Sequence, residues 1–109
     1  MATPIKSAAI ACSSSGSNQI VAAVSGKSIA VLGYVLVANG AVNAKWQSAS
    51  TDKTGLLYLA ANGGAVAPVI PLSKLGAGTC WFSTAAGEAL NLNLSGAVAV
   101  GGHVLYREV

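Results

Sequence analysis

The chain has 109 residues with a formal net charge of +3, and 53% of its residues are hydrophobic while only 8% are charged. This length suits one domain with one two-layer core, and the hydrophobic content argues against a disordered chain. Ordinary soluble domains carry about 25% charged residues. A surface so poor in charge favours association, so we expect a subunit of a larger assembly. The alternative is a secreted domain that Ser, Asn and Thr keep soluble.

The sequence predicts neither a membrane span nor a targeting segment. The longest apolar run, residues 29–38, is about half of the roughly 20 residues that a membrane-spanning helix needs. The residues before Cys12 lack the apolar stretch of a signal peptide. We expect Met1 to be the true start of a chain made in the cytoplasm, where Cys12 and Cys80 remain thiols.

Short β-strands are expected along the whole chain, because 13 glycines, 3 prolines and many Val, Ile and Thr residues interrupt it at strand-like intervals. Residues 13–18 are expected to form a turn, and 49–55 and 71–78 are expected to form loops. The expected strands are 4–12, 19–24, 28–38, 41–48, 56–61, 65–70, 79–83, 90–95 and 97–109.

Several local signals refine these strands. Asn39-Gly40 predicts a type I′ hairpin turn between the third and fourth strands. Ala44 and Trp46 alternate with polar neighbours, and the alternation of Leu and Asn over residues 90–94 is the strongest period-two signal. Pro68 predicts an edge strand, because proline cannot donate to a ladder. A bend or bulge is expected at 101–102, where two glycines are adjacent.

Eight or nine short strands without an intervening helix predict an all-β fold, an antiparallel β-sandwich of about eight strands that is jelly-roll-like. Residues 1–8 are expected to form an N-terminal extended arm, because Pro4 favours an extended backbone. Residues 9–109 are expected to form the single β-sandwich domain.

The strand at 28–38 is apolar on both sides, whereas an antiparallel strand with one wet face should alternate. One side carries Leu32, Tyr34 and Leu36, and we expect these three residues to form a subunit interface. The alternative is that loops or the N-terminal segment cover that side.

Few side chains could carry chemistry. Asp52, Glu88 and Glu108 lie in or beside different turns or termini, and His103, the only histidine, has no nucleophile motif beside it. One histidine and two distant cysteines give no metal-ligand spacing. We expect no catalytic residue, no metal site and no cofactor.

Nucleic-acid binding is not expected either. Proteins that bind nucleic acids concentrate their basic residues in a stripe with interleaved aromatic residues. Here the basic residues are scattered and never adjacent: Lys6, Lys27, Lys45, Lys53, Lys74 and Arg107.

Five stretches carry a resemblance to a known family: IAVLGYVLVANG (29–40), AVNAKWQS (41–48), LAANGG (59–64), TAAGEALNLNL (84–94) and HVLYREV (103–109). Together they resemble the capsid decoration or cement proteins of tailed bacteriophages. The resemblance implies a jelly-roll subunit that sits on the virion surface as a homotrimer, binds the major capsid protein and clamps neighbouring capsomers. It implies no catalytic residue. In that setting Pro4, Ile5 and Lys6 are the expected capsid-contacting arm.

Two other functions remain open. A tail or fibre component of a phage would share this composition. A carbohydrate- or host-binding module would instead use exposed aromatic rings as stacking platforms, although the ordinary role of such rings is core packing. The candidate rings are those of Tyr34, Trp46, Tyr58 and Trp81.

Overall fold

The structure is a computed structural model that describes residues 4–68 and 80–109. Within these residues there are ten strands and no helix, which confirms the predicted all-β class, and hence no helix that is long and apolar enough to cross a membrane. The strands are β1 (Lys6–Cys12), β2 (Gly16–Val21), β3 (Ile29–Ala38), β4 (Val42–Ser48), β5 (Thr51–Asp52), β6 (Leu57–Leu59), β7 (Gly64–Ala67), β8 (Phe82–Ser83), β9 (Leu90–Leu94) and β10 (Val100–Glu108).

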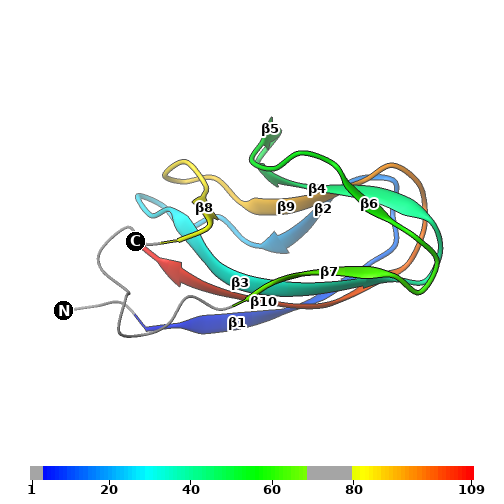
Figure 1. Ribbon diagram of the computed structural model, residues 1–109. Coiled ribbons are helices and arrows are strands. Elements are labelled where there is room, and N and C mark those ends of the chain that lie inside the picture. The colour runs from blue at the N-terminus through cyan, green and yellow to red at the C-terminus, as the bar shows by residue number, and fades with distance from the viewer. Residues whose placement is uncertain (1–3, 69–79) are drawn as a thin grey trace.

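Two antiparallel sheets pack face to face as the layers of a sandwich (Figure 1). Sheet A has the order β1-β10-β3-β7, with β8 also paired to β3, and sheet B has the order β2-β9-β4-β5, with β6 also paired to β4. The main pairs are nested along the chain: β1 with β10, β2 with β9, β3 with β7, and β4 with β6. This nesting is the topology of a jelly roll, in which strand pairs fold over into two sheets. The predicted sandwich is therefore confirmed.

Asn39 and Gly40 do not form the predicted hairpin turn. β3 lies in sheet A and β4 in sheet B, so the segment between them crosses the end of the sandwich. Neither residue has the positive φ that a type I′ turn requires. The backbone of Ala38 instead bonds to Gly63 and Asn62, at 2.8 Å in both cases. The segment leading into β7 thus occupies the edge of β3 where a hairpin partner would pair.

A bulge in β3 changes which of its side chains face the core. Leu105 pairs with Gly33 but Tyr106 pairs with Val31, so Leu32 is an extra residue without a register partner on β10. The bulge shifts the alternation, and Val31 and Leu36 both belong to the core although their numbers differ in parity. The bulge expected at 101–102 is not observed, because pairing continues through both glycines without a register shift; the irregularity there is confined to the φ of +145° at Gly102.

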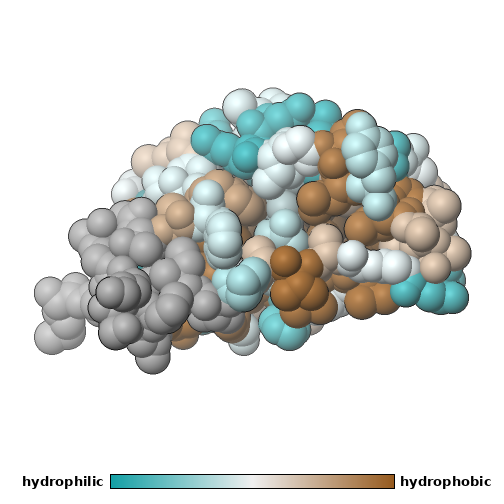
Figure 2. Space-filling view, in the orientation of Figure 1, coloured by the Kyte–Doolittle hydropathy of each residue, from teal (hydrophilic) through white to brown (hydrophobic). Residues whose placement is uncertain are grey.

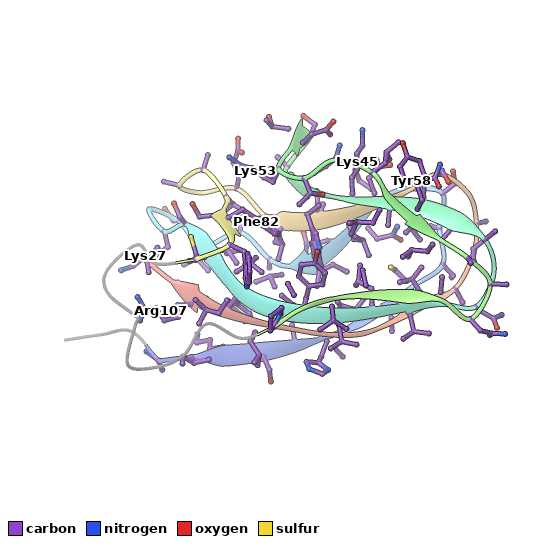
Figure 3. The ribbon with its side chains drawn as sticks, viewed as in Figure 1. Lys27, Lys45, Lys53, Tyr58, Phe82 and Arg107 are labelled. Atoms are coloured by element: carbon purple, nitrogen blue, oxygen red, sulfur yellow. The ribbon has the colours of Figure 1, made fainter. Side chains whose placement is uncertain are left out.

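The core lies between the layers around Trp46. This side chain is fully buried, and its ring centroid lies 5.3 Å from that of Tyr34 and 6.0 Å from that of Phe82. The expected alternation of β4 and β9 is confirmed, since Ala44 and the leucines at 90, 92 and 94 are at most 1% exposed. Figure 3 shows the Phe82 side chain pointing between the two sheets.

Other boundaries differ modestly from expectation. β2 begins at Gly16, which has a φ of +89°, so the turn is shorter than the predicted 13–18, and β5 lies within the expected loop 49–55. β7 ends at Ala67, directly before Pro68, and lies at the edge of sheet A as predicted. The expected loop 71–78 lies outside the described residues.

Candidate interaction surface

The outward-facing residues of sheet A form a surface that we call the apolar face. Ile10, Val104 and Leu36 point into the core, so residues of opposite parity in the same strands point outward. Three registered rows of these residues cross the sheet. They are Ser7, Leu105 and Gly33; then Ala9, His103, Val35 and Val66; then Ala11, Gly101, Val37 and Gly64.

This face is neutral and mostly aliphatic. Val37 is 49% exposed and Val66 is 66% exposed. No charged side chain belongs to the three rows, and their polar side chains are only those of Ser7 and His103. Figure 2 shows hydrophobic residues over β7, on the sheet A side of the molecule, and hydrophilic residues over β5 at the top.

The corresponding outer side of sheet B, which we call the polar face, has the opposite chemistry. Its rows consist of Ser17, Asn93, Lys45, Gln19, Asn91, Gln47, Asp52, Asn43 and Tyr58. Side-chain hydrogen bonds link several of them. Ser17 donates to the Gln47 Oε1 at 3.0 Å, and the Gln47 Nε2 donates to the Asp52 Oδ1 at 2.8 Å. The polar face therefore combines solvated groups with an internal network.

With one exception, the charged side chains that the structure describes lie away from the apolar face. Arg107 follows Leu105 by two residues on β10, so it shares the outward side of sheet A just beyond the first row, where it is 5% exposed. On the polar face, the hydrogen bond from Gln47 and the ion pair with Lys45 at 3.1 Å hold the pKa of Asp52 below its usual value. At one end of the sandwich, the Lys6 Nζ lies 2.9 Å from the Glu108 Oε1, which raises the pKa of Lys6. Figure 3 shows Lys45 and Lys53 on the sheet B side and Lys27 and Arg107 toward that end.

A shallow, open depression of about 620 Å³ adjoins the apolar face. It lies where the β1–β2, β3–β4, β6–β7 and β9–β10 connections meet. Ala11, Val37 and Gly101 belong both to its lining and to the third row of the apolar face, and Asn39 and Asn62 add side-chain amides. The depression therefore extends the apolar face toward one end of the sandwich.

The predicted interface residues Leu32, Tyr34 and Leu36 do not lie on this surface. Leu32 and Leu36 are 0% exposed within the single chain, and Tyr34 is half-buried against Trp46. Burial raises the pKa of Tyr34. The interface expectation is corrected for this reason: these side chains already have partners inside the fold. β3 instead presents Val35 and Val37, which the sequence placed on its other side.

The predicted arm is shorter than expected. Lys6 is the first residue of β1 and pairs with Tyr106, so residues 6–8 belong to sheet A and not to a separate arm. Pro4 and Ile5 precede the strand and are exposed, Ile5 by 41%. Capsid contact by these two residues remains a prediction.

The aromatic side chains do not form a row. Trp46 is buried and Tyr34 packs on it, which leaves Tyr58 and Trp81 as the exposed candidates, at 78% and 52%. Tyr58 lies on β6 in sheet B, whereas the backbone N–H of Trp81 donates to the carbonyl oxygen of Val31 in sheet A. The two exposed rings therefore belong to different layers.

The groups that chemistry would need are dispersed or engaged in structural contacts. The carboxylates of Asp52, Glu88 and Glu108 accept hydrogen bonds from Gln47, Ser48 and Lys6, respectively. Cys12 and Cys80 are both thiols, and burial raises the pKa of Cys12. Over the described ranges, no group of three or more His, Cys, Asp or Glu side chains could hold a metal ion.

No protein family, curated protein or solved structure matches this chain. A jelly roll by itself hosts many functions, so the function must be inferred from the surfaces.

Proposed function

We propose that this chain is a structural protein of a virus particle, a decoration or cement protein of a tailed-phage capsid. In this proposal it binds the major capsid protein through the apolar face, acts as an oligomer and strengthens contacts between capsomers. The observation that carries the proposal is the contrast between the apolar face and the polar face. The resemblance of residues 29–48 and 84–94 to such proteins supports the choice of partner.

The apolar face has the properties that a permanent contact needs. Burying Val37 and Val66 is favourable, at about 25 cal/mol per Å² of apolar area removed from water. The core of a protein interface is typically depleted in charge, and the three rows contain none. The polar face, with Lys45 and Asp52, is suited to remain in water on the outside of the particle.

A matched pair of variants tests the choice of face. Val37→Lys adds one positive charge to the apolar face, and Gln19→Lys adds the same charge to an exposed strand position of the polar face. We expect Val37→Lys to lower the affinity for particles that lack this protein at least tenfold, while Gln19→Lys binds as wild type does. Cosedimentation with such particles measures both, and thermal unfolding verifies that each variant is folded. Equal binding by both variants would contradict the proposal.

A second experiment tests the role on the particle. Particles without this protein are expected to lose their genome at a lower temperature than complete particles, and addition of the purified chain should restore the difference. Electron microscopy of labelled particles should place the chain on the capsid. A position on the tail or a fibre would instead support the alternative structural role.

A further inference from the structure

Among the residues that the structure describes, β1 leaves one side of sheet A open for pairing. It has seven residues and pairs with β10 along its whole length, but no strand within the described residues pairs with its other side. In an edge strand, alternate N–H and C=O groups point away from the sheet and lack a backbone partner. Ser7, Ala9 and Ala11 are exposed along it.

The other edges are protected in ways that β1 is not. Strands β5 to β8 have two to four residues each, and Pro68 follows β7 directly. β2 has six residues, but its register shifts after Gln19, and the Asn18 Nδ2 donates to the carbonyls of Ser14 and Gly16 at 2.9 and 3.1 Å. Short strands, prolines, bulges and charges are the usual protection of sheet edges. From residue 7 to residue 12, β1 has none of them.

We propose that β1 pairs with β1 of a second copy of this chain, antiparallel and about a two-fold axis at Ala9. Identical strands in antiparallel orientation are self-complementary, which is the requirement of a two-fold interface, and strand addition at an open edge is a recurring mode of recognition. The resulting dimer has one continuous sheet made of both copies of sheet A. The pairing itself uses only the edge of β1, although the area that it adds to the apolar face matters only if the proposed function holds.

The side chains of β1 fit this register. Ala9 is the central residue of Lys6–Cys12, so only an axis at Ala9 pairs all seven residues. Ser7 then lies opposite Ala11, and Lys6 lies opposite Cys12. The two Lys6 side chains are at opposite ends of the paired strands, about 20 Å apart at a rise of about 3.3 Å per residue. Each Lys6 already has an ion-pair partner in Glu108 at 2.9 Å.

The area of the apolar face favours a second copy of this chain as the partner that pairs with the edge of β1. At about 6.6 Å between rows and about 4.8 Å between strands, three rows on four strands cover about 400 Å². A stable interface buries about 800 Å² on each partner. Ser7, Ala9 and Ala11 belong to both β1 and the apolar face, so the pairing joins two apolar faces into one of sufficient area. Because a two-fold contact closes at two copies, it gives a dimer and not the trimer that the resemblance implies.

Introducing a charge at Ala9 tests the pairing. Ala9→Glu and Ala9→Lys each place like charges directly opposite each other across the axis, which is destabilising. Multi-angle light scattering at micromolar concentration should give wild type twice the chain mass of 10.7 kDa. Each variant alone should dissociate at a concentration at least tenfold higher than wild type does. An equimolar mixture of the two variants should recover the dimer, because opposite charges then face each other.

Val66→Lys is the matched control, because Val66 lies in the same row of the apolar face but on the opposite edge strand. It should remain a dimer. A monomeric or trimeric wild type, a dimer of Ala9→Glu as stable as wild type, or a mixture that stays monomeric would each overturn the pairing. Particle binding by Val37→Lys is a separate measurement, so the pairing and the proposed function can fail independently.

Discussion

The apolar face and the polar face lie on the two layers of the same sandwich, and each is formed by three longer strands and two short ones. They differ in the residues that alternate with the buried core residues along each strand. In β9, Asn91 and Asn93 separate the buried leucines, whereas in β1, Ala9 and Ala11 flank the buried Ile10. Sheet B therefore separates an inner and an outer side by polarity. Across the three rows, sheet A is mostly apolar or small on both sides.

Hydrogen bonding follows the same division. Gln47 on the polar face bonds to both Ser17 and Asp52 through its side chain. Among the residues that the structure describes, no side-chain hydrogen bond joins two members of the apolar face. In an isolated chain, water and internal hydrogen bonds satisfy the polar groups of the polar face. Covering the exposed valines of the apolar face with another surface lowers the free energy, because it removes apolar area from water. The comparison thus supports the apolar face as the side on which we propose that a partner binds.

The largest expected change in the free energy of unfolding distinguishes the inward and outward sides of β3. Leu36→Ala should lower the free energy of unfolding by about 2–5 kcal/mol, because it leaves a cavity in the core. Val37→Ala should change it by less than about 0.5 kcal/mol, because Val37 is half-exposed. Urea unfolding of the two variants measures both values. A small loss for Leu36→Ala would restore the original prediction that Leu36 lies between subunits.

The sequence predicted sheet B better than sheet A for this reason. The alternation of β9 and of Trp46 with its polar neighbours defined strands and core together. In β3 no charged or amide side chain marked the outer side, and the only local signal of the bulge at Leu32 was the adjacent Gly33. The edge position of β7 was predictable from Pro68. The crossing at Asn39-Gly40 was not, because it depends on long-range pairing of Ala38 with residues 62 and 63.

The next effect concerns two adjacent glycines of sheet A. Gly102 has a φ of +145°, and a Cβ added there would collide with the carbonyl oxygen of Val35 on the neighbouring strand. Gly101 has no such φ, and its added Cβ would lie 3.7 Å from the Ile10 carbonyl oxygen, an ordinary contact. Gly102→Ala should cost about 2–3 kcal/mol, and Gly101→Ala less than about 0.5 kcal/mol. Thermal and urea unfolding compare them, and equal losses would contradict the close strand approach at Gly102.

A smaller change in the free energy of unfolding is expected when a single polar residue is removed from each face. Gln47 is 5% exposed, and its removal in Gln47→Ala leaves Ser17 and Asp52 with fewer partners, at a cost of about 1–2 kcal/mol. His103 is exposed on the apolar face, so His103→Ala should change the free energy of unfolding by less than about 0.5 kcal/mol. The same urea titrations provide both values. If His103→Ala cost as much as Gln47→Ala, the claim that only the polar face is joined by side-chain contacts would be wrong.

The smallest effect is a dependence on pH that belongs to the polar face. Hydrogen bonds from Gln47 and Lys45 lower the pKa of Asp52 from its ordinary value of 3.8. A lowered pKa in the folded state means that the carboxylate stabilises the fold above pH 3.8, and that this contribution disappears as the pH falls through the lower, folded-state pKa. Asp52→Asn should therefore have a lower urea midpoint than wild type at pH 7, and the difference should shrink as the pH falls below 3.8. Because Asp52 is exposed, the difference should be small. A difference that does not shrink would mean that Asp52 contributes through its shape and not through its charge.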